Sequence, residues 1–361
     1  MLPATTTSIV GGPLGATVAR TLGPAAAARL PGVLLSGGGR RRLHDSAATR
    51  ETRRATTPHT TQNQPARRRL SVATPLLARV RSLAECASIE VSPATVDTFI
   101  AETEDYEEVD NLLYARRKVF VNMLRREVEH FEAVGRGVRA LSERGHVPVP
   151  HVPASILADE AQAAWVIENL AVSGAKECLI VGGNTPATST TLTAAKVADI
   201  AAHSMDRVSF AAFPEGHPRA PDGAKQLDAK LDALASKCRV GVVSQWTCNP
   251  ATTSKWLGDF LRRHPAATVH VGVAGPAGRH KIARFASFCG VPLHPKRSAD
   301  DDVFHAPSHA AMTLAADLEY YDVPHHQVHL HLFSLNTGRT VDFLRRLTNG
   351  DPQAKSNLLA A

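Results

Sequence analysis

The sequence predicts a (β/α)8 barrel, and three observations point to that fold class. From residue 87 onward, short β-branched runs alternate with longer amphipathic stretches, as in parallel strands joined by helices. The first seven candidate strands begin at positions 87, 118, 147, 177, 207, 239 and 267, so one βα unit repeats at a nearly constant interval. Eight strands over residues 87–347 match the roughly 250 residues of a typical TIM barrel. An open Rossmann-type sheet is the alternative, but no G-x-G-x-x-G follows the first strand.

Each strand is expected where a β-branched run ends close to a glycine or a polar residue. The eight candidates are Ala87–Val91, Lys118–Asn122, Val147–Val152, Glu177–Gly182, Arg207–Ala212, Arg239–Gln245, Ala267–Val273 and Gln327–Ser334. Between the second and third, apolar residues recur at steps of three and four over residues 131–141, which predicts an amphipathic helix. The stretch between the seventh and eighth strands is much longer than the others, and we expect two helices there, near 278–288 and 308–320.

The head of the chain, residues 1–80, differs in composition from the rest. It holds twelve arginines, no lysine and two acids, and no aromatic side chain occurs before residue 99. So few large apolar groups cannot offset the entropy of ordering, and we therefore expect residues 1–80 to be disordered. An arginine-rich, acid-poor head is typical of a mitochondrial presequence, which predicts a matrix protein; an ordinary basic tail is the alternative. The barrel then occupies residues 81–350, followed by a short tail at 351–361.

Charge and composition exclude several other classes of protein. The formal net charge is +7, but residues 81–361 alone carry −3, so the basic character belongs to the head and not to a folded nucleic-acid-binding surface. No run approaches the roughly 18 apolar residues of a membrane span. The five cysteines form no C-x-x-C pair, which argues against a zinc ribbon, a thioredoxin-like motif or a disulfide framework.

The C-terminal ends of the predicted strands carry polar residues and glycines. In a (β/α)8 barrel these ends face one shared mouth, where catalytic groups lie. The residues at or near these ends are Glu90, His151, Gly182, Gly183, Asn184, Phe213, His217, Gln245 and Asn336. A carboxylate, two histidines and several amides suit a large organic ligand that forms hydrogen bonds. Glycines let a planar ring or a phosphate approach the backbone closely.

Six short segments stand in order at these strand ends. They are S-I-E-V-S-P (88–93), V-P-H-V-P-A (149–154), L-I-V-G-G-N-T-P (179–186), F-P-E-G-H-P (213–218), S-Q-W (244–246) and V-G-V-A-G-P (271–276). Together they resemble the catalytic barrel of the methylenetetrahydrofolate reductase family, in its divergent bacterial-type branch. The resemblance implies an oxidoreductase of one-carbon metabolism and methionine biosynthesis. Such a flavoprotein holds FAD at the barrel mouth and reduces 5,10-methylenetetrahydrofolate to 5-methyltetrahydrofolate with NADH or NADPH.

The resemblance also implies roles for individual residues. Glu90 matches the family's general acid, a task for which burial must raise the pKa of the carboxyl toward neutrality. Asn184 stands at a second catalytic position, where the family carries an aspartate. Gln245 matches the residue that contacts the pterin, and Asn336 is assigned to the folate site with it. The positions assigned to the flavin are His151, Gly182, Gly183, Phe213, His217 and Lys230.

Two other functions stay open, because Asn184 removes a full negative charge from the family's site. One is a flavin-free, folate-dependent methyltransferase. The other is a barrel without activity that serves as a structural subunit of a mitochondrial complex; a homo-oligomer is also compatible with the sequence. The histidines at 325, 326, 329 and 331 resemble a metal site, but no cysteine or carboxylate cluster completes the set, so no metal is predicted.

Overall fold

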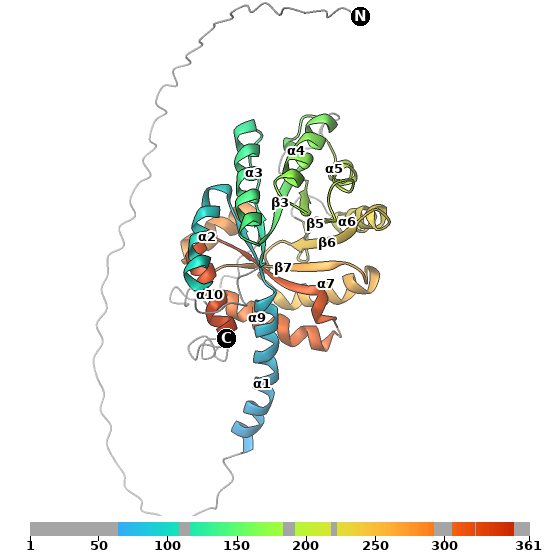
Figure 1. The fold of residues 1–361 in the computed structure, drawn as a ribbon. Coiled ribbons are helices and arrows are strands. Elements are labelled where there is room, and N and C mark those ends of the chain that lie inside the picture. Colours follow the sequence, from blue (N-terminus) through green and yellow to red (C-terminus); the bar gives the residue numbers. More distant parts are fainter. Residues whose placement is uncertain are drawn as a thin grey trace, which may run out of the picture. The chain divides into compact units, whose positions relative to one another are not determined.

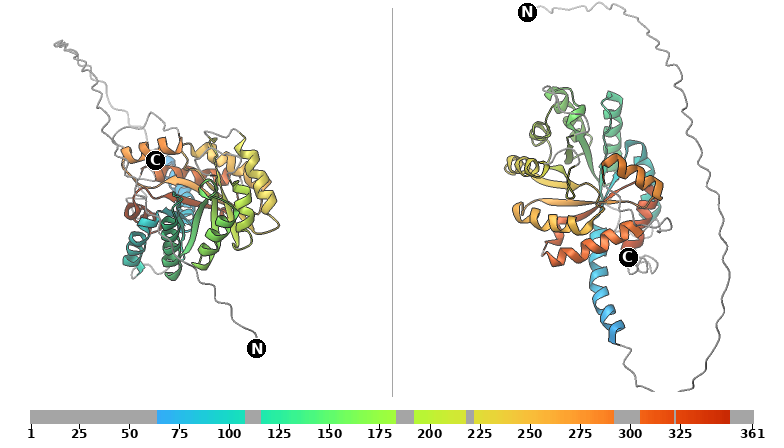
Figure 2. Two further views of the ribbon diagram at one scale, coloured as in Figure 1. Left: turned by 90° about the horizontal axis from the view of Figure 1, so that it is seen from above. Right: turned by 180° about the vertical axis from the view of Figure 1, so that it is seen from behind.

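The computed structural model describes residues 64–107, 116–182, 192–217, 222–291, 305–321 and 323–349. The predicted fold class is confirmed, because eight parallel strands close into one barrel in chain order. Helices form a layer around the strands (Figures 1 and 2). Among the described residues, no helix combines the length and the apolar character that crossing a membrane requires.

The strand boundaries agree with the predicted ones to within one residue at each end. The strands are β1 (Ser88–Val91), β2 (Lys118–Val121), β3 (Val147–Pro153), β4 (Glu177–Val181), β5 (Arg207–Ala212), β6 (Arg239–Ser244), β7 (Thr268–Ala274) and β8 (Val328–Phe333). The helices are α1 (Gln64–Glu85), α2 (Val96–Glu107), α3 (Val128–Glu143), α4 (Glu160–Val172), α5 (Ala194–Ala201), α6 (Gly223–Leu234), α7 (Pro250–Arg263), α8 (Arg279–Cys289), α9 (His305–Tyr320) and α10 (Thr337–Asn349). Three short 3₁₀ turns are η1 (Pro93–Thr95), η2 (Ala154–Ile156) and η3 (His325–Gln327).

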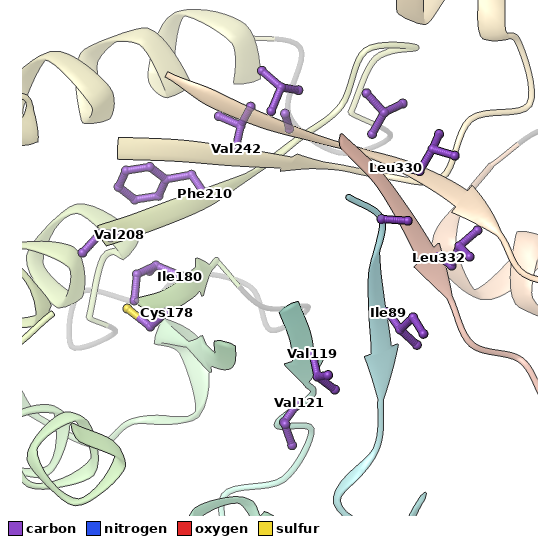
Figure 3. Close-up of a cluster of buried hydrophobic side chains, with 14 of the residues drawn as sticks. Ile89, Val119, Val121, Cys178, Ile180, Val208, Phe210, Val242, Leu330 and Leu332 are labelled. Carbon is purple, nitrogen blue, oxygen red and sulfur yellow. The ribbon is translucent and has the colours of Figure 1, made fainter. Parts of the chain in front are cut away.

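Alternate residues of each strand point outward, toward the helices, and form the main hydrophobic core. Figure 3 shows part of this core, with side chains contributed by strands all around the barrel: Ile89, Val119, Val121, Cys178, Ile180, Val208, Phe210, Val242, Leu330 and Leu332. The helices supply the facing layer through stripes of the predicted kind. In α3, for example, Phe131, Val134, Val138 and Leu141 are buried.

Helix α1 corrects the prediction that residues 1–80 are disordered, because it begins at Gln64. Val80, Leu83 and Ala84 lie in the hydrophobic core, so the end of this helix belongs to the folded unit. The Arg117 guanidinium holds the helix end by donating to the carbonyl oxygens of Ala84 at 3.1 Å and Ala87 at 2.8 Å. The prediction failed here because it depended on absent aromatic residues, whereas this helix packs through small and aliphatic ones. Residues 1–63, with the predicted presequence, and the tail at 351–361 lie outside the described residues.

The inward-facing residues are apolar on one side of the barrel and polar on the other. Phe120, Val149, Leu179 and Val243, from β2, β3, β4 and β6, form a small buried cluster. On β7, β8 and β1 the corresponding positions include His270, His331 and Ser88, which are buried, and Glu90, which is nearly so. We refer to these four residues as the polar wall.

Candidate active site

A cavity of about 250 Å³ lies at the C-terminal ends of β5 and β6. It is lined by Phe213, Pro214, Glu215, Gly216 and His217 after β5, by Gln245 and Trp246 after β6, and by Cys289, Gly290 and Val291 at the end of α8. Three predicted site residues, Phe213, His217 and Gln245, therefore meet in one cavity. Its place in the fold is the one where (β/α)8 barrels carry their active sites.

Glu215 fixes the loop that forms one side of this cavity. Its carboxylate accepts hydrogen bonds from the Thr247 hydroxyl at 2.7 Å and from the backbone N–H groups of Cys248 and Asn249, both at 2.8 Å. These groups directly precede α7, where a negative charge is also favoured by the helix dipole. The sequence analysis gave Glu215 no role; here it ties the loop after β5 to the loop after β6.

The same loop brings two predicted flavin contacts together. The Gly216 N–H donates to the Phe213 carbonyl at 3.0 Å, and Gly216 has φ +98°, a left-handed conformation that favours glycine. This turn sets the Phe213 and His217 rings edge to face, with centroids 4.2 Å apart. Residues 213–217 therefore form a turn that presents an imidazole and a phenyl ring to the cavity.

Glu90 lies at the C-terminal end of β1, between two histidines. Its Oε2 atom is 3.4 Å from His331 Nε2 and 3.7 Å from His151 Nε2, and the Asn122 side chain also hydrogen-bonds to the carboxylate. The Glu90 side chain is 16% exposed, so the carboxylate is nearly but not completely enclosed. His151 Nε2 is buried and has no hydrogen-bond partner in the described part of the chain, so a ligand can supply one.

These neighbours correct the expectation that Glu90 has a raised pKa. Burial favours the neutral acid, but the charge of His151 and the hydrogen bond and charge of His331 outweigh it, so the pKa of Glu90 is below its ordinary value. Burial lowers the pKa of His151 more than the Glu90 carboxylate raises it. At neutral pH the resting site therefore holds a carboxylate beside a neutral His151.

Ser88 connects two further histidines that the sequence analysis did not assign. Its Oγ lies 3.0 Å from His270 Nδ1 and 2.9 Å from His331 Nδ1. The Phe120 ring covers both imidazoles, with centroids 5.4 Å from His270 and 4.6 Å from His331. Strand alternation in the sequence could have revealed them, because it places Ser88 on β1, His270 on β7 and His331 on β8 at inward-facing positions.

Gly272 leaves room for the Phe333 ring to pack against His331. A Cβ atom at this position would lie 2.5 Å from the Ser244 carbonyl oxygen and 2.7 Å from the Phe333 ring. Any side chain there would displace Phe333, whose ring packs against His331 with centroids 4.9 Å apart. Among the described residues, no group of three or more His, Cys, Asp or Glu side chains is placed to hold a metal ion.

Cys289 links the cavity to Glu90. Burial, with a smaller contribution from the Glu90 charge, raises the pKa of the Cys289 thiol to about 11. The thiol is therefore protonated at neutral pH and is a poor nucleophile.

Besides Glu90 and His151, three further predicted residues do not line the cavity. The Lys230 ammonium lies 5.7 Å from the centre of the Phe210 ring, between α6 and β5, where burial lowers its pKa. Asn336 caps α10, since its Oδ1 accepts the Arg339 N–H at 3.1 Å. Gly182 is exposed, and a Cβ there would meet nothing within 4 Å. Gly183 and Asn184 lie outside the described residues.

No protein-family model matches the chain. Among solved structures, the chain is similar to a Toxoplasma gondii protein assigned as a deoxyribose-phosphate aldolase, with 10% identity, a TM-score of 0.43, and coverage of 76% of this chain and 97% of that one. It is also similar to a thermostable mutant of the xylanase Xyn10A from Cellvibrio japonicus, with 10% identity, a TM-score of 0.47, and coverage of 73% and 97%. At such identities the similarity concerns the fold, and the function must be argued from the site.

Proposed function

We propose that this chain is a flavin-dependent reductase that converts 5,10-methylenetetrahydrofolate to 5-methyltetrahydrofolate with NADH or NADPH. The observation that carries the proposal is the Glu90 carboxylate, held between His151 and His331 at the barrel mouth. It lies close enough to the cavity for its charge to act on Cys289. This arrangement suits a reaction in which a proton and a hydride reach one organic substrate.

The residues around the cavity fit a flavin ring. Phe213, His217 and Trp246 line the cavity and offer aromatic faces and edges. Outside its lining, beside Glu90, the buried His151 Nε2 lacks a partner among the described residues. A volume of about 250 Å³ accommodates one ring system, with the remainder of the molecule extending outward. In this proposal Phe213, His217 and His151 hold the flavin. When bound, the flavin supplies a two-electron carrier between the nicotinamide and the folate.

The chain's own residues handle the proton. Glu90, protonated at Oε2, donates to a nitrogen of the substrate's five-membered ring as its C–N bond breaks, which leaves an iminium able to accept hydride. Gln245 stands beside the cavity to contact the pterin. Its Oε1 accepts a hydrogen bond from the backbone N–H of Trp246 at 3.0 Å, which fixes the orientation of the amide. Asn122 and His331 hold the Glu90 carboxylate in place between turnovers.

The arginine-rich head is part of the same proposal. We infer that it directs the protein to the mitochondrial matrix, where folate would be the substrate. The two other functions remain as outcomes of the test below: a methyltransferase that binds folate without flavin, and a structural subunit without activity.

The test is the visible absorption spectrum of the purified full chain, recorded after incubation with FAD. We expect a flavin spectrum that bleaches anaerobically with NADH or NADPH and recovers on addition of methylenetetrahydrofolate. A flavin that is bleached by the nicotinamide but is not reoxidised by methylenetetrahydrofolate would refute the substrate assignment. If no flavin binds, the reductase is excluded, and folate binding then separates the methyltransferase from the structural subunit.

A further inference from the structure

We propose that a proton path runs along the inside of the barrel, from its N-terminal end to Glu90, through His329, His270, Ser88 and His331. The reaction that it serves depends on the proposed function, in which each turnover consumes one proton. The geometry of the path does not depend on that function.

Strand register places the members of the path side by side. β7 and β8 pair His270 with His329, and β1 and β8 pair Ser88 with His331. Inner-face positions alternate along each strand, so all four side chains enter the barrel. The ring centroids of His270 and His329 are 5.1 Å apart. Ser88 Oγ lies 3.0 Å from Nδ1 of His270 and 2.9 Å from Nδ1 of His331.

From His270 onward the hydrogen bonds of the path point toward Glu90, whereas His329 and His270 are joined by ring contact alone. Because the Glu90 carboxylate only accepts, His331 donates through Nε2–H, and the path requires the His331 tautomer whose Nδ1 is free to accept. The Ser88 hydroxyl donates to that nitrogen and accepts from His270 Nδ1–H. A second acceptor for the hydroxyl, the Leu330 carbonyl oxygen, is more distant at 3.3 Å.

A proton that arrives at His270 Nε2 therefore has a route to the carboxylate. The His270 Nδ1–H proton passes to Ser88 Oγ, the Ser88 proton to His331 Nδ1, and the His331 Nε2–H proton to Glu90 Oε2. Each transfer breaks one N–H or O–H bond and forms another, and no electrons leave the chain. One proton is gained at Glu90, and both imidazoles end in their other tautomer. The path resets when the two rings and the Ser88 hydroxyl rotate back to their starting orientations.

The outer end of the path reaches the N-terminal end of the barrel. There Glu177 accepts from Lys118 at 2.7 Å and pairs with Arg207 at 3.6 Å, and these three side chains are 12 to 20% exposed. His329 is only partly buried, so solvent can reach it.

The charges around the histidines keep the path neutral at rest. Burial and the cations Lys118 and Arg207 lower the pKa of His329 to about 4, with Glu177 opposing and His326 adding to the effect. Burial, Lys118, His329, His331 and Arg207 likewise hold the pKa of His270 well below its ordinary value. Both histidines are therefore neutral at pH 7, and a proton does not accumulate on either.

The rest of the interior offers no comparable route among the described residues. Next to the polar wall, Phe120, Val149, Leu179 and Val243 form an apolar cluster, and its Phe120 ring packs against His270 and His331. Glu90 is a carboxylate at rest and must regain its proton in each turnover. A bound ligand would fill the cavity at the mouth, so the path gives Glu90 a supply from the opposite end of the barrel.

The first test is ¹⁵N NMR of the histidine-labelled full chain at pH 7, with His270→Gln and His331→Gln used to assign the signals. We expect neutral His270 with its proton on Nδ1 and neutral His331 with its proton on Nε2. Ser88→Ala should disturb both signals. Ser254→Ala, which also removes a fully buried hydroxyl but lies in α7, should leave them unchanged. A proton on Nδ1 of His331 or on Nε2 of His270 would overturn the proposal.

The second test is the rate at which methylenetetrahydrofolate reoxidises the reduced flavin, measured in H₂O and D₂O. Ser88→Ala should slow it about tenfold and enlarge the solvent isotope effect, since one relay group is lost. His329→Gln, at the partly exposed entrance, should do the same if Ser88→Ala does not fold. If these variants and Ser254→Ala reoxidise the flavin at equal rates, the proton path is excluded, but the proposed reductase activity is not. If the wild-type protein does not react with methylenetetrahydrofolate, the reductase activity is excluded. The histidine tautomers measured by NMR would then still test the proton path.

Discussion

The two sides of the barrel interior use opposite chemistry at equivalent positions. On β2, β3, β4 and β6 the middle of the inner face is apolar, because Phe120, Val149, Leu179 and Val243 form one buried cluster. The ends of these strands carry Lys118, His151 and Glu177. On β7, β8 and β1 it carries the polar wall. Bulky apolar residues are the usual filling of such a barrel, and a buried polar group that lacks a partner costs about 1–3 kcal/mol. The apolar side therefore accounts for the fold, and the polar wall is where function is to be sought.

The largest expected effect belongs to the polar wall. Glu90→Gln keeps the shape of the side chain and removes its acid, so folate-dependent reoxidation of the flavin should fall by about 10²- to 10⁴-fold. Flavin binding and bleaching by the nicotinamide should be retained, because neither needs the Glu90 proton. Stopped-flow absorbance follows both half-reactions. An equal loss in the two would show that Glu90 supports structure and not proton transfer.

A substitution on the apolar side should instead reduce stability. Leu179→Ala removes a buried side chain from the cluster and should lower the free energy of unfolding by about 2–5 kcal/mol. Leu179→Met keeps the volume and should cost less than about 1.5 kcal/mol. Urea unfolding measures both. If the folded Leu179→Ala protein lost as much folate reduction as Glu90→Gln, the division between the two sides would be wrong.

The two sides should also respond differently to pH. The pKa values of His329 and His270 are lowered in the folded chain. Between pH 6.5 and about 4 these histidines therefore bind protons in the unfolded chain but not in the folded one, so stability falls as pH falls. Glu90, with its lowered pKa, adds a further loss below about pH 4.5, where its unfolded carboxyl becomes protonated. Unfolding free energies measured across pH 4 to 7 should therefore decrease toward acid.

The contribution of one histidine to this slope can be separated. His329→Gln should reduce the slope by at most about 1.4 kcal/mol per pH unit, the value for one proton. Leu179→Met, on the apolar side, should shift the whole curve and leave its slope unchanged. An unchanged slope in His329→Gln would mean that this histidine has the same pKa in the folded and the unfolded chain.

The smallest effect is expected outside the interior, at Asn336. Since its side chain caps α10, Asn336→Ala should cost about 1 kcal/mol of stability. Asn336→Asp keeps the capping oxygen and should restore most of it. Thermal unfolding measures the stability, and the KM for folate tests the alternative. A rise in KM without loss of stability would return Asn336 to the substrate site, as the sequence first suggested.

The sequence was sufficient for the fold because the signals are local. Alternation within each strand and the regular spacing of the strands both survive in the linear chain, and the strand ends follow to within one residue. The same reasoning placed Phe213, His217 and Gln245 at one mouth. It misassigned the head boundary, since α1 packs through aliphatic residues that resemble a linker in composition.

The site chemistry depended on contacts that no local pattern reveals. Ser88 meets His270 across 182 residues and His331 across 243, so the network exists only once the barrel closes. The pKa of Glu90 shows the same limit: burial alone predicts a rise, and the histidines from β3 and β8 reverse it. Asn336 shows a different limit of the sequence argument. A polar residue at a strand end can cap the helix that follows and need not bind a ligand.

The most direct test of the account is the amount of 5-methyltetrahydrofolate formed by the full chain with FAD, NADPH or NADH, and methylenetetrahydrofolate. Wild type and the Ser254→Ala control should form the product at equal rates, and Glu90→Gln should form it at least about 100-fold more slowly. Absence of product from wild-type protein that is folded and loaded with flavin would contradict the reductase. Equal rates in wild type and Glu90→Gln would contradict the role of the polar wall.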